Sequence, residues 1–344
     1  MIEAIDLFCG AGGLTAGLQK AGVKVKAGYD IEELCRYAFE YNNQVPFFNC
    51  DVSILRKEDI AQQYGNGTVR LLAGCAPCQP FSKYNQGKDT TLDKKWPLLY
   101  AFARLIEDDL PELVTMENVP EVVNHQVYHD FVQKLTDLGY FVWANTVVCA
   151  DYGIPQSRRR HILLASRFGE LELMPPTHKN NWVVIKEVIG DLPEIKAGEQ
   201  CASDPLHRAA SLNALNLKRI KHSKPGGTWR DWPEEFRLQC HKQKAGSTYG
   251  SVYGRMRWDR LSPTMTTQCY GYGNGRFGHP EQDRAISLRE AAIFQTFPRD
   301  YQFYPSEKKI RMTDIGRMIG NAVPVRLGEV IGLSLIRHIE CYSS

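Results

Sequence analysis

The sequence lacks the features of an exported or membrane-inserted protein. Its amino terminus, MIEAIDLFCGAGG, has no basic region followed by a long apolar run. No stretch of about 18 consecutive apolar residues occurs, which is the length that a membrane-spanning helix needs. We therefore expect a cytoplasmic protein with no membrane partner.

The cysteines lack the spacing of a disulfide framework or of a metal site. Ten are scattered over 344 residues, and an intracellular chain of this size keeps them as thiols. Cys75 and Cys78 form a single Cys-x-x-Cys pair. A structural zinc site needs four ligands, and the sequence has neither a second such pair nor a suitably spaced pair of histidines. We expect no bound metal, and a redox pair remains the alternative for these two cysteines.

The chain also has little net charge, but that charge is unevenly distributed. The formal net charge is +3, whereas residues 207–276 contain 13 Lys or Arg and 4 Asp or Glu, so this stretch carries +9 and the remainder −6. A charge run is usually a solvated surface. Interleaved aromatic residues and the lack of regular periodicity favour a nucleic-acid-binding surface here. The aromatic residues are Trp229, Trp232, Tyr249, Tyr253, Trp258, Tyr270 and Tyr272.

The first half of the chain alternates short apolar runs with helical patterns. This alternation is typical of a parallel sheet with helices on both faces, so we expect a doubly wound α/β fold. Leu14, Leu18 and Ala21 share a helical face, and apolar residues recur at helical spacing from Leu98 to Ile106. We expect strands at 2–8, 23–29, 69–73, 113–116 and 141–149.

A loop-rich second lobe follows. From about residue 175 glycine, proline and charged residues become frequent, and helical pattern returns only at 287–297 and 314–338. A chain of this length can form one large core and a second, smaller lobe. We expect one domain from 1–181 with 283–344, and another at 182–282.

Two segments lie where ligands bind in such sheets. Residues 6–13, DLFCGAGG, follow the first expected strand, and their glycines allow a tight turn close to a ligand, although such a turn alone is weak evidence. Asp30 ends the second strand, where an acidic side chain can bind the ribose of an adenosine-containing cofactor or cap a helix. Residues 74–82, GCAPCQPFS, end a third strand, which is the expected place for a nucleophile.

Six ordered segments resemble the motif set of the cytosine-5 DNA methyltransferase family. The resemblance spans nearly the whole chain and extends to HPEQDRAISLREAAIFQTFP at 279–298. It implies a Rossmann-like, doubly wound class I S-adenosylmethionine-dependent methyltransferase sheet, with 182–282 as a smaller, loop-rich target-recognition domain. The six segments are DLFCGAGG, APCQPFS, Glu117-Asn118-Val119, QSRRR at 156–160, RLSPTMTT at 260–267 and GNAVP at 320–324.

The resemblance implies the catalytic residues. Cys78 stands at the nucleophile position of Pro-Cys-Gln, whereas Cys75 lies outside that pattern and is expected to pack. A thiolate that adds to C6 of cytosine makes C5 nucleophilic enough to take a methyl group, and Glu117 fits the acid that serves ring nitrogen N3. Arg158 and Arg160 match a Gln-x-Arg-x-Arg pair that would hold the cytosine O2 and the nearby backbone and keep the thiolate charged.

The resemblance further implies S-adenosyl-L-methionine as cofactor and S-adenosyl-L-homocysteine as its product. Phe8 would stack on adenine, Asp30 would bind ribose and Asp51 would meet the adenine amino group. Ala76 replaces a proline that is frequent before Pro-Cys-Gln, and Asp30 replaces a commoner Glu; we expect both to be tolerated. The expected cofactor-binding residues are Asp6, Phe8, Gly10, Gly12, Asp30, Ile31, Asp51, Leu98, Asn321 and Val323.

This chemistry requires a cytosine flipped out of the duplex, so the basic lobe is expected to hold double-stranded DNA. We expect a monomer that is cytoplasmic and nucleoid-associated, and the sequence leaves open whether it works with a cognate restriction endonuclease. The alternatives are a tRNA cytosine-5 methyltransferase and an inactive homologue that acts as a nucleic-acid-binding module. The expected DNA-binding residues are Gln79, Ser82, Arg230, Tyr249, Arg255, Arg257, Gln268, Tyr270 and Arg276.

Overall fold

The computed structural model describes residues 1–77, 97–243, 250–308 and 311–342. Within it the chain divides into two compact units. The first unit comprises Met1–Tyr152, Arg159–Thr177 and Ala322–Ser344, and the second comprises Gly153–Arg158 and His178–Asn321. Four residues predicted to act in catalysis or DNA binding lie outside the described residues: Cys78, Gln79, Ser82 and Tyr249.

A seven-stranded sheet forms the centre of the first unit, with strand order β3-β2-β1-β4-β5-β7-β6. The first five strands pair in parallel, whereas β7 is antiparallel to both β5 and β6, so the sheet is mixed and not wholly parallel as expected. All five predicted strands are present; β3 and β7 were not predicted. The strands are β1 (Ile2–Leu7), β2 (Lys24–Asp30), β3 (Phe47–Asn49), β4 (Val69–Gly74), β5 (Leu113–Asn118), β6 (Phe141–Val148) and β7 (Arg159–Ser166).

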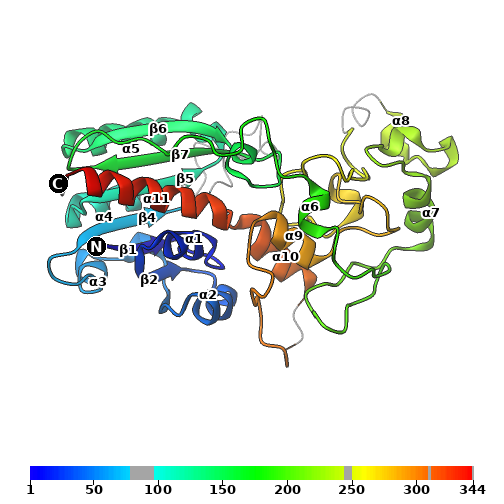
Figure 1. Ribbon diagram of the computed structural model, residues 1–344, viewed down its shortest axis with the longest axis horizontal. Helices are drawn as coiled ribbons and strands as arrows, with labels where there is room; N and C mark the ends of the chain where they lie inside the picture. Colours follow the sequence, from blue (N-terminus) through cyan, green and yellow to red (C-terminus); the bar gives the residue numbers. More distant parts are fainter. Residues whose placement is uncertain (78–96, 244–249, 309–310, 343–344) are drawn as a thin grey trace. The chain divides into compact units, whose positions relative to one another are not determined.

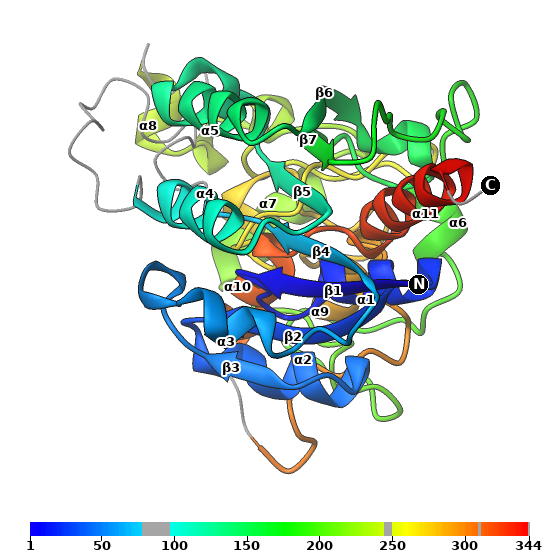
Figure 2. The same ribbon diagram turned by 90° about the vertical axis from the view of Figure 1, so that its left-hand side faces the viewer.

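Helices cover both faces of this sheet, which confirms the doubly wound α/β fold. Figures 1 and 2 show α1 and α11 over one face and α4 and α5 over the other. The side chains that α4 and α5 contribute to the core include Phe102, Phe131 and Leu135, all essentially inaccessible to solvent. The helices of the first unit are α1 (Gly13–Ala21), α2 (Arg36–Asn43), α3 (Lys57–Ala61), α4 (Pro97–Asp109), α5 (Gln126–Asp137) and α11 (Val325–Tyr342).

The two helices α1 and α11 pack closely because glycines face each other at the contact. A Cβ atom on Gly17 would lie 2.2 Å from the carbonyl oxygen of Val325, and one on Gly328 would lie 2.9 Å from that of Leu14. The span Met312–Tyr342, which contains α11, is long and apolar enough to cross a membrane, but 67% of its apolar window is buried inside the protein. Burial of that kind is what a core helix shows.

The C-terminal helical pattern is divided between the two units. We expected one helical face across 314–338, but the structure has α10 (Met312–Asn321) in the second unit and α11 in the first. Pro324 directly precedes α11, and proline has no N–H to continue a helix. Residues 283–321 lie in the second unit, beyond the expected limit at 282. Compactness does not show which residues recognise a target, so the assignment of that role to 182–282 stays a prediction.

The second unit is rich in loops, and the described part of it contains only isolated bridges and no named strand. Its small core includes Trp229, Trp232 and Tyr272. This corrects one expectation, because these three aromatic side chains of the basic stretch are buried rather than exposed to nucleic acid. The other helices of the unit are α6 (Ile185–Ile189), α7 (Ala214–His222), α8 (Gln239–Lys242) and α9 (Leu288–Phe294).

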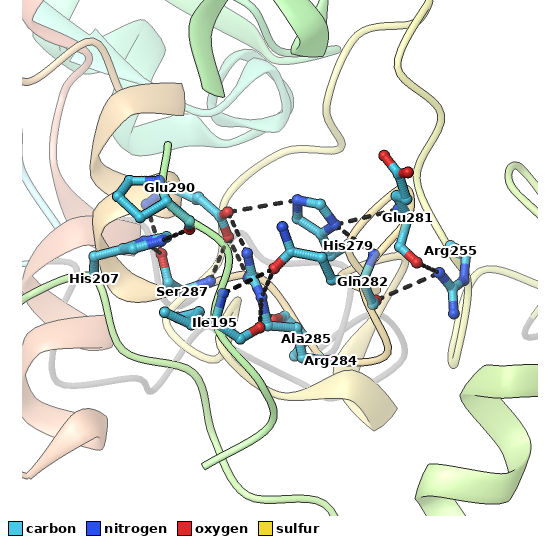
Figure 3. A network of polar contacts seen from close by, with 11 residues as sticks. Ile195, His207, Arg255, His279, Glu281, Gln282, Arg284, Ala285, Ser287 and Glu290 are labelled. Atoms are coloured by element: carbon cyan, nitrogen blue, oxygen red, sulfur yellow. Dashed lines mark hydrogen bonds and ion pairs between the residues drawn. The ribbon is translucent and has the colours of Figure 1, made fainter. Parts of the chain in front are cut away.

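A buried ionic network fixes the start of α9 (Figure 3). Arg284 donates from both terminal nitrogens to the two carboxylate oxygens of Glu290, each at 2.7 Å. Glu290 also accepts from the backbone N–H of Ser287, whose hydroxyl in turn accepts from the N–H of Glu290, so the pair forms a capping box. His279 lies with Nε2 3.7 Å from Glu290.

Candidate active site

The carboxyl ends of β4 and β5 bring Cys75 and Glu117 together. The two strands are parallel neighbours in which Gly74 pairs with Met116, so the next residues on each strand are also adjacent. The thiol of Cys75 donates to Oε2 of Glu117, with 2.9 Å between sulfur and oxygen. Glu117 is buried, with 3% of its surface exposed. Sequence reasoning assigned Cys75 to packing and missed this contact.

Arg160, near the start of β7, supplies a positive charge to the same carboxylate. β7 runs antiparallel to β5, so its first residues lie at the end of β5 that carries Glu117. Nε of Arg160 lies 2.7 Å from Oε1 of Glu117, and both side chains are largely buried. The contact is an ion pair, and among the described residues Oε1 accepts no hydrogen bond. The structure thus joins two of the predicted catalytic residues.

Arg158 lies in the second unit, where its side chain contacts the loop that carries the RLSPTMTT segment. Its side chain is buried, and Nη1 donates to the carbonyl oxygen of Met265 at 3.2 Å. Gln156 holds the same loop, because its Oε1 accepts from the N–H of Met265 at 2.8 Å. The hydroxyl of Ser262 donates to the carbonyl oxygen of Pro155 at 2.7 Å. Two segments more than 100 residues apart in sequence therefore form one polar assembly.

The expected cofactor site lies at the carboxyl ends of β1 and β2. Oδ2 of Asp30 accepts from the N–H of Gly10, and Oδ1 accepts from the N–H of Glu32, both at 2.8 Å. Asp30 therefore orders both the glycine turn and the turn that follows β2, and its binding of ribose stays a prediction. Gly10 has a φ of 51°, and apart from its chain neighbours no atom of the described residues lies within 4 Å of its Cβ position, which leaves open space beside the turn.

Burial changes the acidity of two carboxyl groups there. Burial raises the pKa of Asp6 to about 7, and a hydrogen bond from the Thr15 hydroxyl at 2.7 Å only partly offsets this. Burial also raises the pKa of Asp30. Oδ1 of Asp6 accepts no hydrogen bond from the described residues. A buried oxygen of this kind retains the capacity to accept one from a ligand.

The remaining predicted cofactor residues differ in exposure and backbone conformation. Ile31, directly after β2, has 70% of its surface exposed. Asp51 accepts from the N–H of Ser53 at 2.8 Å and caps a short turn. Phe8 adopts a φ of 58°. Among the rest, Gly12 has a φ of 87°, Leu98 is half-buried, Val323 is buried, and Asn321 is exposed at the end of α10 in the second unit.

The predicted DNA-binding residues that the structure describes differ in solvent exposure and in their contacts within the protein. Arg230, Arg257 and Gln268 are exposed, and Tyr270 is half-buried. Arg255 is buried instead, and its guanidinium donates to Asp283 at 2.7 Å and to the carbonyl oxygen of Ile220 at 2.8 Å. Half-buried Arg276 donates to the carbonyl oxygens of Gly226 and Gly227. The last two arginines thus make stabilising contacts within the second unit.

Comparison with known proteins covers nearly the whole chain. The sequence model of the family described as C-5 cytosine-specific DNA methylase matches residues 2–337. Type II methylase M.HgiDII of Herpetosiphon aurantiacus is 51% identical over 340 residues, which cover 98% of this chain and 95% of that protein. Type II methyltransferase M.Eco47II of Escherichia coli is 31% identical over 349 residues, covering 98% and 79%.

A solved structure shares the fold. A prophage-encoded DNA modification methyltransferase from E. coli superimposes with a TM-score of 0.76 at 22% sequence identity, covering 99% of this chain and 100% of that one.

Proposed function

This chain belongs to the family of C-5 cytosine-specific DNA methylases, and from that premise we propose that it methylates a cytosine flipped out of a specific sequence in duplex DNA. That it is a DNA cytosine-5 methyltransferase follows from the family; the covalent route and the residues that serve it are the proposal. One observation supports this route most strongly. The buried carboxylate of Glu117 lies at the end of β5, beside the strand that leads to Cys78, with Arg160 at 2.7 Å.

In this proposal the thiolate of Cys78 adds to C6 of the cytosine while Glu117 protonates or hydrogen-bonds N3. Addition makes C5 nucleophilic, and C5 then takes the methyl group. Release requires that a base remove the C5 proton and that the thiolate leave. Arg160 holds the carboxylate of Glu117 in place, and its positive charge stabilises the anionic groups of the site.

The residues at the ends of β1 and β2 fit S-adenosylmethionine. When bound, it supplies an electrophilic methyl group on a cationic sulfur. The two carboxyl groups of Asp6 and Asp30 suit a ligand with positive charge and hydroxyl donors, and Oδ1 of Asp6 has the capacity to accept a hydrogen bond. The exposed side chain of Ile31 offers an apolar surface for adenine.

We assign DNA binding to the second unit and target recognition to residues 182–282. The +9 charge of residues 207–276 supports this assignment, because lysine and arginine neutralise phosphates. Among the predicted DNA-binding arginines, Arg230 and Arg257 are exposed, and Arg257 also donates to Asp259 at 2.7 Å. The protein would act as a monomer on double-stranded DNA, in the cytoplasm with the nucleoid. The names of its relatives as type II enzymes support a partnership with a cognate restriction endonuclease.

A methyl-transfer assay tests the proposal. Purified protein is incubated with S-adenosylmethionine labelled in the methyl group, and with either duplex plasmid DNA or tRNA. We expect label in 5-methylcytosine of the duplex alone, at sites that bisulfite sequencing then maps. Label in tRNA and not in DNA would contradict the proposal that duplex DNA is the substrate. Absence of label from both would support an inactive nucleic-acid-binding module.

A further inference from the structure

The contact between Cys75 and Glu117 lies outside the set of residues that the family resemblance assigned. The 2.9 Å between sulfur and Oε2 is too short for two anions or for two groups without a shared proton. A proton must therefore lie between them, with the thiol as donor when the carboxylate is ionised. The thiol is thus bonded to the carboxylate and does more than fill space.

The two oxygens of Glu117 have different environments as a result. Oε2 is occupied by the thiol of Cys75, whereas Oε1 lies beside Arg160 and accepts no hydrogen bond among the described residues. A carboxyl group on a flexible side chain can present either oxygen by rotating its last torsion, which is broad and roughly two-fold. A donor fixed on one oxygen removes this choice and leaves the other oxygen to meet the base.

The backbone keeps both partners in place. Cys75 follows β4 directly, and its N–H donates to the carbonyl oxygen of Leu7 at 3.3 Å. Asn118, next to Glu117, donates from Nδ2 to the carbonyl oxygen of Ala76 at 3.3 Å. These bonds link the end of β4 to β1 on one side and to the end of β5 on the other. The thiol is therefore held by rigid elements rather than by a surface loop.

We propose that Cys75 is a positioning residue, which fixes Oε2 of Glu117 through its thiol and so directs Oε1 to N3 of the target cytosine. The inference rests on the proposed role of Glu117. A hydroxyl in place of the thiol donates to the same oxygen, whereas a methyl or isopropyl group cannot. The rate of the chemical step should therefore depend on a donor at this position and not on its volume.

Single-turnover methylation, at saturating DNA and cofactor, tests the proposal with three variants. Cys75→Ala and Cys75→Val should each slow the step about fivefold, the size expected for loss of one hydrogen bond from a weak donor. Cys75→Ser should stay within about twofold of the unchanged protein. Binding of S-adenosylhomocysteine and of DNA should be unchanged in all three. Cys149→Ala, which removes another buried thiol of the first unit, is the control and should keep the full rate.

A double-mutant cycle separates this inference from the proposed function. In a Glu117→Gln background, Cys75→Ala should slow the reaction no further, because the thiol acts through the carboxylate. If Glu117→Gln alone reacts at the full rate, the proposed role of Glu117 is wrong. If Glu117→Gln is slow but Cys75→Ala reacts normally, or if the two effects multiply, only the positioning role is overturned. If Cys75→Ala fails to bind S-adenosylhomocysteine, the positioning role is tested by comparing Cys75→Val with Cys75→Ser. Equal rates of these two variants would then overturn it.

Discussion

The guanidinium of Arg160 and the carboxylate of Glu117 form a buried ion pair, with 2.7 Å between Nε and Oε1. Their side chains are 13% and 4% exposed, so water screens the pair only weakly. Nη1 of Arg160 also donates to the carbonyl oxygen of Arg159 at 2.8 Å, which fixes the guanidinium at the start of β7. The arginine therefore stabilises the fold and the charge of the site together.

Arg160→Met should destabilise the first unit, because it leaves the carboxylate of Glu117 buried without its cation. We expect the free energy of unfolding, measured by urea denaturation, to fall by about 3 kcal/mol. Arg159→Met is the matched control: Arg159 is exposed on the same strand, and its loss should change stability by less than about 0.5 kcal/mol. Equal effects of the two substitutions would show that the ion pair contributes nothing specific.

The sequence predicted five of the seven strands of the central sheet but none of the polar contacts across it. The strands at Ile2–Leu7 and Val69–Gly74 follow from local apolar runs, whereas β7 begins with two arginines and a histidine that obscure its strand pattern. Contact between Cys75 and Glu117, 42 residues apart, depends on the register of β4 against β5. Side-chain periodicity within each strand does not determine that register. The pairing of Arg284 with Glu290 also had no sequence signal beyond the motif that contains both.

His279 should make the second unit sensitive to acid. Burial lowers its pKa to about 4, and Glu290 only partly offsets this. The unfolded chain therefore binds more protons between about pH 6.5 and 4, and stability falls as pH falls through this window. The loss at pH 5, relative to pH 8, should be about 2 kcal/mol.

Further acidification should add the effect of Glu290. Burial alone would raise the pKa of Glu290, but the two-point contact with Arg284 outweighs it and lowers the pKa to about 2. The contribution of Glu290 to the free energy of unfolding is present above about pH 4.5 and is lost as the pH falls from there to about 2. His279→Asn offers the backbone N–H groups of Glu281 and Gln282 an acceptor that does not titrate. Urea denaturation of this variant should show a flatter profile between pH 8 and 5; an unchanged profile would mean that another group causes the loss.

An exchange of residues 182–282 for the matching lobe of a relative should change the methylated sequence and leave cofactor affinity nearly unchanged. The expected cofactor residues all lie outside that span. Oε1 of Gln282 accepts from Arg284 at 2.7 Å, so the donor lobe must keep glutamine at its last position. Bisulfite sequencing identifies the methylated site, and isothermal titration with S-adenosylhomocysteine measures the affinity. An unchanged target sequence would place recognition elsewhere in the chain.

The covalent step through Cys78 is the central claim, and trapping it is the most direct test. Duplex DNA with 5-fluorocytosine at the target cannot lose fluorine as a cation, so the enzyme cannot be released after methyl transfer. We expect a protein–DNA adduct that resists denaturation and forms only with S-adenosylmethionine. Cys78→Ser should abolish it, because a neutral hydroxyl is a far weaker nucleophile than a thiolate, and Cys75→Ser should retain it. An adduct that persists in Cys78→Ser and disappears in Cys75→Ser would contradict the assignment of the nucleophile, and an adduct formed by neither the unchanged protein nor the variants would contradict the covalent mechanism.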